Sequence, residues 1–168
     1  MTINVRKLPR ELSPWLATVV RLGLAAVFAW AAIPKIANPD AAVISVRAYQ
    51  LVPEGAVHAV AWGLPFVELA VAALLLAGIA TRVAALAAGA LLLVYVAGIA
   101  SAWSRGLRID CGCFSSGGYD PAAGGARYAW DILRDLGLLL AAGLLAWRPA
   151  SRLALVNEPA AEPVLEDS

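Results

Sequence analysis

Four apolar stretches, each close to the length of a bilayer crossing, restrict most strongly how this chain can fold. A helix needs about 20 mostly apolar residues to cross the hydrocarbon core of a bilayer. Suitable segments lie at about residues 15–33, 57–80, 82–103 and 128–148. The apolar part of the last segment covers only Leu136–Trp147. That helix must therefore begin earlier and carry Asp131, Arg134 and Asp135 into or near the membrane.

The composition supports the same fold class. Of the 168 residues, 61% are apolar and 15% are charged, with a mean hydropathy of +0.75. Soluble domains have roughly 45–50% apolar and 25% charged residues. We expect an all-α integral membrane four-helix bundle at residues 14–149, between a cytoplasmic segment at 1–13 and a disordered acidic tail at 150–168. A net charge of +1 and the lack of a basic stripe argue against a nucleic acid partner, so membrane lipid is the expected surrounding.

The basic residues of the loops predict the orientation. Six Lys and Arg residues lie in the two tails and the second loop, against five in the first and third loops. Cytoplasmic loops carry the excess of basic residues. We therefore expect a multi-pass protein of the bacterial plasma membrane, with both termini in the cytoplasm and the long loops outside.

The first of these outer loops has its own helix signal. Pro34 is expected to end the first long helix and to leave Lys35 at the membrane surface. Asn38, Pro39 and Asp40 then provide a cap, a first-position proline and an acidic first turn. The pattern predicts a short helix that lies in the membrane interface.

The two cysteines of the chain are separated by a single glycine, at Cys111-Gly112-Cys113 in the loop before the fourth span. The thiols are close enough to form a disulfide if the backbone turns, and glycine tolerates unusual dihedral angles. Such a ring is small, and a strained disulfide is more easily reduced than a structural one. Bridging one residue also adds little restraint to the unfolded chain. These properties favour a catalytic pair.

Three interpretations of this pair stay open. The cysteines are incidental, or they bind a metal such as Cu(I) or Zn, or they form a redox dithiol, which we favour. A closed zinc site needs four ligands, whereas the chain offers these two thiols and one histidine, His58, so we predict no metal site. Arg108 favours the reactive thiolate, and Asp110 opposes it.

Charged residues inside the spans form the second candidate site. A charge in a membrane span is costly, and it indicates a function with a buried partner. At 1.5 Å per residue, Arg21, Glu68 and Arg134 lie at similar depths, roughly 10 to 18 Å below the outer surface. Asp131 shares a helix face with Arg134 and Asp135. We expect one cluster, in which Glu68 pairs with Arg21 or Arg134, as a structural clamp or a proton relay.

Several short stretches have the order and spacing of a known family of membrane proteins. The most specific is Ile109-Asp110-Cys111-Gly112-Cys113-Phe114. The others are Arg21-Leu22-Gly23, Phe28, Lys35, Ala48-Tyr49, Leu51, Pro53, Leu64-Pro65-Phe66-Val67-Glu68-Leu69, Thr81-Arg82 and Arg134. On these residues, which extend over about positions 15–148, the chain resembles the MauE/DoxX-like membrane proteins.

Two positions depart from the pattern of that family. Ser115 stands where relatives often have Gly directly after the cysteine motif, which affects the flexibility of the loop. Asp135 stands where relatives often have Asn, so a neutral hydrogen-bonding role does not carry over to that position.

The resemblance implies a DoxX-like bundle of four transmembrane helices with a redox-associated role. In the namesake of the family, that role is maturation of the disulfide-rich small subunit of methylamine dehydrogenase. DoxX-like relatives are associated with thiosulfate:quinone oxidation.

Together with the cysteine pair, the resemblance predicts a thiol-disulfide oxidoreductase in which Cys111 or Cys113 attacks and the other resolves. Its expected partner is an extracytoplasmic thioredoxin-like protein or a disulfide-containing client, and a membrane quinone is the candidate cofactor. The alternatives are a non-catalytic scaffold or accessory subunit of an envelope oxidoreductase complex, and a copper-handling membrane protein.

Overall fold

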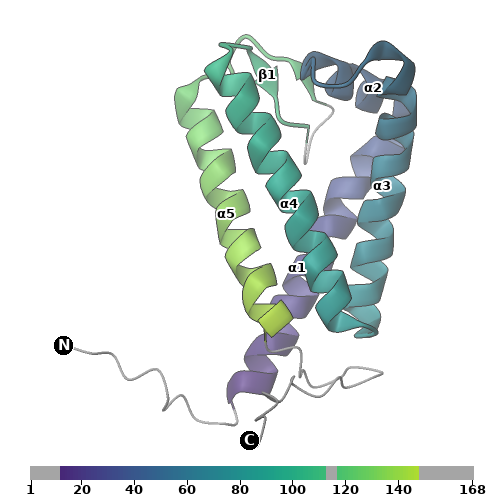
Figure 1. Cartoon of the computed structure of the whole chain (residues 1–168), viewed down its shortest axis with the longest axis vertical. Helices are drawn as coiled ribbons and strands as arrows, with labels where there is room; N and C mark the ends of the chain where they lie inside the picture. Colours follow the sequence, from purple (N-terminus) through teal and green to yellow (C-terminus); the bar gives the residue numbers. More distant parts are fainter. Residues whose placement is uncertain (1–11, 113–116, 148–168) are drawn as a thin grey trace, which may run out of the picture.

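The computed structural model describes residues 12–112 and 117–147, which are mostly helical (Figure 1). The long helices that lie side by side in this part are α1 (Leu12–Ala37), α3 (Glu54–Ala77), α4 (Thr81–Ser104) and α5 (Gly125–Trp147). One end of the group is covered by the short helix α2 (Pro39–Ala48) and the antiparallel strands β1 (Ile109–Asp110) and β2 (Gly118–Tyr119). α4 lies close to α3 at the opposite end and diverges from it toward the covered end.

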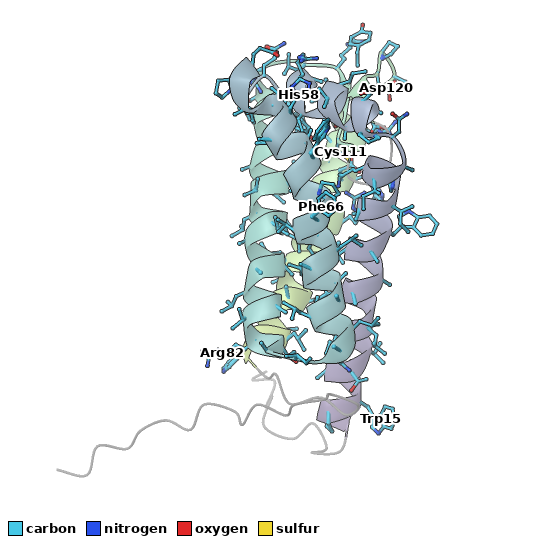
Figure 2. The ribbon with its side chains drawn as sticks, turned by 90° about the vertical axis from the view of Figure 1, so that its right-hand side faces the viewer. Trp15, His58, Phe66, Arg82, Cys111 and Asp120 are labelled. Carbon is cyan, nitrogen blue, oxygen red and sulfur yellow. The ribbon has the colours of Figure 1, made fainter. Side chains whose placement is uncertain are left out.

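In the described part of the chain, three helices are long and apolar enough to cross a membrane. These spans are Pro14–Ala37, Glu54–Ala77 and Thr81–Ser104, with mean hydropathies of 2.0, 2.1 and 2.4. Large apolar side chains point outward from them, as Phe66 and Trp15 do in Figure 2, which suits contact with lipid tails. The chain is therefore a multi-pass membrane protein. α5 is not among these three spans, because it carries charged residues in its first half.

Small residues hold the long helices together. The largest core cluster draws on α1, α3, α4 and α5, and its members include Leu24, Phe28, Ala72, Leu75, Ala84, Ala88, Ala142 and Leu145. Alanine allows helix backbones to approach closely, and this dispersion contact replaces the hydrophobic effect as the source of helix association in lipid.

The end of α1 differs from the prediction. Pro34 does not terminate the helix, which continues to Ala37. A proline removes its own N–H donor, but the carbonyl oxygen of Pro34 still accepts a hydrogen bond of 3.0 Å from the Asn38 N–H. Transmembrane helices tolerate such a proline. Lys35 therefore lies on the last turn of α1, with its side chain only 10% exposed.

The short helix predicted in the first loop is confirmed as α2. The Asn38 side chain accepts a hydrogen bond of 3.1 Å from the Ala41 N–H, and Pro39 occupies the first helical position. At the other end, Arg47 binds both carboxylate oxygens of Glu54, which connects α2 to the start of α3. This hydrogen bonding raises the pKa of the Arg47 guanidinium.

Candidate functional site

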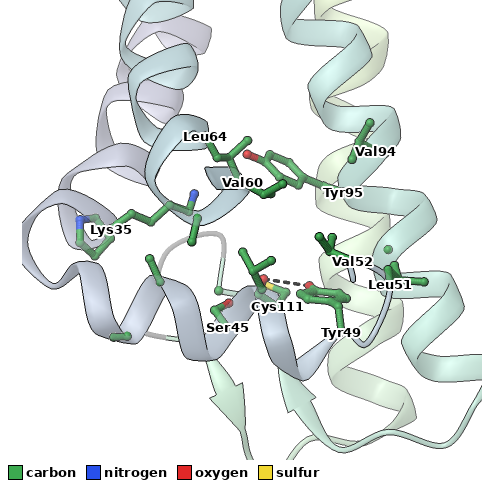
Figure 3. Close-up of a pocket in the computed structure, with 17 residues that line it drawn as sticks. Lys35, Ser45, Tyr49, Leu51, Val52, Val60, Leu64, Val94, Tyr95 and Cys111 are labelled. Carbon is green, nitrogen blue, oxygen red and sulfur yellow. Dashed lines mark hydrogen bonds between the residues drawn. The ribbon is translucent and has the colours of Figure 1, made fainter. Parts of the chain in front are cut away.

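Cys111 follows β1 directly and is partly buried at the covered end of the protein. It packs against a small cluster of Ile99, Ala123 and Tyr128. The Tyr49 hydroxyl, just after α2, donates a hydrogen bond of 2.8 Å to the carbonyl oxygen of Cys111 (Figure 3). The second predicted cysteine, Cys113, lies outside the described residues. The backbone of Cys111 is thus positioned by contacts from several elements.

Gly112 has a backbone conformation that a larger residue would adopt only with strain. Its φ is +67°, and its N–H donates a hydrogen bond of 2.9 Å to the Asp110 side chain. A Cβ at this position would overlap the Ser45 hydroxyl of α2, and the same holds at Gly117. The glycine of the cysteine motif therefore serves both the turn and the close packing of the loop on α2.

The base of the cysteine loop is connected to the start of α5. Arg127 forms ion pairs with Asp110 and with Asp120, the latter at 3.0 Å. The Tyr128 hydroxyl accepts a hydrogen bond of 2.9 Å from the Ile109 N–H and donates one of 2.7 Å to the carbonyl oxygen of Leu107. These contacts hold β1, and hence Cys111, in a fixed relation to α5.

A cavity of about 150 Å³ lies next to Cys111 (Figure 3). Its walls come from the end of α1, from α2, from α3 and α4, and from the cysteine loop. Most of the lining is aliphatic. The polar side chains of the lining include those of Lys35, Ser45, Tyr49 and Tyr95. Cys111 therefore shares one largely apolar space with a lysine and two tyrosines.

Three polar side chains connect α1, α3 and α4 at this cavity, those of Lys35, Glu68 and Tyr95. The Lys35 ammonium lies 2.6 Å from Glu68 Oε1, with side-chain exposures of 10% and 0%. The Tyr95 hydroxyl donates to the same oxygen, and the Lys35 ammonium lies 5.7 Å from the centre of the Tyr95 ring. Among the described residues, Glu68 Oε2 accepts no hydrogen bond. We call these three residues the Lys35 triad.

The charges of α5 form a second, local group. Arg134 lies 3.2 Å from Asp131 Oδ1 and 2.9 Å from Asp135 Oδ1, and both carboxylates are buried. The three residues are spaced so that they share one face of α5.

Arg21 has a third kind of environment. Its guanidinium donates hydrogen bonds of 2.6 and 3.1 Å to the carbonyl oxygens of Leu75 and Leu76, in the last turn of α3. Carbonyl groups at a helix C-terminus lack intrahelical donors and carry partial negative charge, which suits a buried cation.

The expected pairing of Glu68 with Arg21 or Arg134 is therefore wrong. The five predicted charges have three separate sets of partners. Lys35, on the last turn of α1, is the partner of Glu68 instead. Arg21 contacts α3 seven residues beyond Glu68, a distance of roughly 10 Å along the helix.

Two members of the triad were not predicted from the sequence as site residues. The sequence pattern predicts Lys35 at the membrane surface and Tyr95 within an apolar span. A signal for Tyr95 was present, since it is the one hydroxyl-bearing side chain between Leu91 and Ile99. A tyrosine hydroxyl inside a membrane requires a hydrogen-bond partner.

The family model described as "Methylamine utilisation protein MauE" matches residues 13–148. The chain belongs to this family. The matched region contains every residue of the cavity, the Lys35 triad and both cysteines. No solved structure matches the chain.

Curated relatives agree with this assignment to the MauE family. A methylamine utilization protein MauE from Paracoccus denitrificans is 38% identical over 141 residues, which cover 83% of this chain and 76% of that protein. Those from Methylorubrum extorquens and Paracoccus versutus are 36% and 39% identical, over 80% and 83% of this chain and 70% and 73% of their own lengths.

The first prediction concerns the packing of Gly112 on α2. Gly112→Ala should lower the melting temperature in detergent more than Gly106→Ala does. Both glycines have a φ of +67°, but a Cβ at Gly106 meets no atom within 4 Å. Adding Ser45→Ala to Gly112→Ala should recover much of the difference, because it removes the overlapping hydroxyl. Equal melting temperatures for the two single variants would show that the loop does not pack on α2.

The second prediction concerns the ion pair of Lys35 and Glu68. Lys35→Met should lower the free energy of unfolding by about 3–5 kcal/mol, because it leaves Glu68 buried without its cation. Lys35→Met combined with Glu68→Gln should cost less than Lys35→Met alone. The exposed pair of Arg47 and Glu54 is the control, and Arg47→Met should cost far less than Lys35→Met, because water screens an exposed ion pair. Denaturant unfolding in detergent measures all three, and a cost for Lys35→Met no larger than that control would contradict the burial.

Proposed function

We propose that this chain is an integral membrane thiol-disulfide redox protein that uses Cys111 and Cys113 to support disulfide formation in an extracytoplasmic partner. The observation that carries the proposal is the position of Cys111, fixed by packing and by the Tyr49 hydrogen bond beside a cavity of a membrane protein. The curated relatives are named as methylamine utilization proteins, so we infer that the partner acts in methylamine utilisation. The family resemblance makes methylamine dehydrogenase the proposed client.

In the proposed reaction, the Cys111–Cys113 disulfide is the oxidant. A thiolate of the partner attacks one of the two sulfurs, which forms a mixed disulfide and releases the other cysteine as a thiolate. A second thiol of the partner attacks the mixed disulfide. The partner then holds the new S–S bond, and Cys111 and Cys113 have taken up two electrons and two protons.

We further propose a bundle of four transmembrane helices in which α5 is the fourth crossing. Along its length α5 lies beside α4, which is itself long enough to span the bilayer (Figure 1). The charges of α5 are paired with one another, which lowers the cost of placing them in the membrane. Four crossings put both termini on the same side of the membrane. The excess of basic residues in the tails and the second loop makes that side the cytoplasmic one, which leaves the cysteine loop outside.

The third prediction tests this topology by cysteine labelling. In a variant that lacks Cys111 and Cys113, Tyr119→Cys should react with a membrane-impermeant maleimide in intact cells, because Tyr119 is 76% exposed at the covered end. Ile79→Cys, in the turn between α3 and α4 at the opposite end, should react only after lysis. The reverse pattern would invert the orientation, and labelling of both or neither in intact cells would rule out this arrangement.

The fourth prediction tests the redox proposal by trapping the partner. Cys111→Ser or Cys113→Ser should accumulate a mixed disulfide that runs as a larger species on a non-reducing gel. The remaining thiolate attacks a disulfide of the oxidised partner, the reverse of the proposed exchange, and the second cysteine that would release the partner is missing. Mass spectrometry of that species identifies the partner. The variant that lacks both cysteines is the control and should form none.

Two results would contradict this redox proposal. If neither single variant forms a mixed disulfide while the protein still supports growth on methylamine with both cysteines removed, the chain is a scaffold. If the purified protein carries copper that is lost in both single variants, the cysteines are metal ligands.

A further inference from the structure

The cavity beside Cys111 opens toward the lipid-facing surface of the protein. Val60 on α3 and Val94 on α4 line it, and both are also exposed on the outside of membrane-spanning helices. The two helices diverge toward this end, and Figure 3 shows the cavity residues between them. A molecule dissolved in the bilayer can therefore reach the cavity without passing through water.

Size and lining restrict what the cavity holds. Its volume is about 150 Å³, and an apolar cavity of roughly that size holds a single benzene ring in another protein. Its lining is largely aliphatic, which suits the faces of a flat ring. An acyl chain would also fit such walls, but it gives no reason for a lysine at the wall of the cavity.

Polar side chains at the wall of the cavity can bind an oxygen atom carried by such a ring. Lys35 and Tyr95 reach the cavity from α1 and α4 (Figure 3). An ammonium has three N–H donors, and the ion pair of Lys35 with Glu68 Oε1 uses one of them. Lys35 can thus also donate to an acceptor in the cavity and stabilise negative charge that develops on it. Cys111 and Gly112 line the same space.

We propose that this cavity binds the head group of a membrane quinone, which re-oxidises the Cys111/Cys113 pair. The inference rests on the proposed function, since it names the acceptor of that reaction. Two S–H bonds break and one S–S bond forms, which releases two electrons and two protons. The quinone takes up both, and its two carbonyl oxygens become the hydroxyls of the quinol. Lys35 holds one of these oxygens.

The test uses the full-length protein, reduced and placed in phosphatidylcholine nanodiscs. Decylubiquinone and glutathione disulfide serve as separate oxidants, and the remaining thiols are counted by maleimide mass shift. Val60→Trp fills the mouth of the cavity. Val67→Trp is the matched control, because Val67 lies two turns along α3 with an exposure of 48% against 39% for Val60, and it does not line the cavity.

Decylubiquinone should oxidise the wild-type pair. In Val60→Trp, the ratio of the rate with decylubiquinone to the rate with glutathione disulfide should fall about tenfold, which is equivalent to about 1.4 kcal/mol of lost binding free energy. In Val67→Trp this ratio should equal that of the wild type. Oxidation by glutathione disulfide but not by decylubiquinone, or equal ratios in the two variants, would overturn the quinone site and leave the proposed function standing. If neither oxidant joins the cysteines, the proposed function fails and the quinone site fails with it.

Discussion

The ion pair between Lys35 and Glu68 determines how the covered half of the protein is built. Neither charge is stable alone in hydrocarbon, so α1 and α3 must be aligned to bring the two side chains together. Tyr95 donates to the same carboxylate and adds α4 to this alignment. α1 ends at Ala37, only two residues after the lysine, so α2 begins close to the level of the ion pair. The ion pair therefore sets where the first loop enters the space between α3 and α4.

α2 in turn supports the cysteine loop. Ser45 leaves room only for glycine at position 112, and Tyr49 holds the carbonyl oxygen of Cys111. From the other side, Arg127 and Tyr128 of α5 bind the strand that precedes the cysteine. The loop is thus fixed between the first loop and the last helix, which explains why residues far apart in the chain surround one cysteine.

The other buried charges have partners of their own. Arg21 uses the carbonyl oxygens at the end of α3, and Arg134 uses two carboxylates of its own helix. Each of these charges thus has partners other than the Lys35 triad, which costs less than one large cluster in a medium of low dielectric constant. Of the described charged residues, Lys35 is the one that lines the cavity.

The sequence by itself determined the elements that depend on local chemistry. The lengths of the apolar runs predicted three of the membrane spans, Asn38 and Pro39 predicted the start of α2, and the cysteine motif indicated Gly112 as a turn residue. Each of these follows from a property of a few neighbouring residues, such as the number of apolar side chains needed to cross lipid or the dihedral angles open to glycine.

Only the tertiary structure decided which distant residues meet. Depth along an isolated helix gave Glu68 the wrong partner, because the height of α1 relative to α3 depends on a helix that continues through Pro34. The role of Tyr95 and the cavity beside Cys111 likewise depend on how α3 and α4 diverge, and no local pattern encodes that divergence. Spacing along the chain fixes positions within a helix, whereas contacts between helices fix their relative height, and the site lies where four helices and the cysteine loop meet.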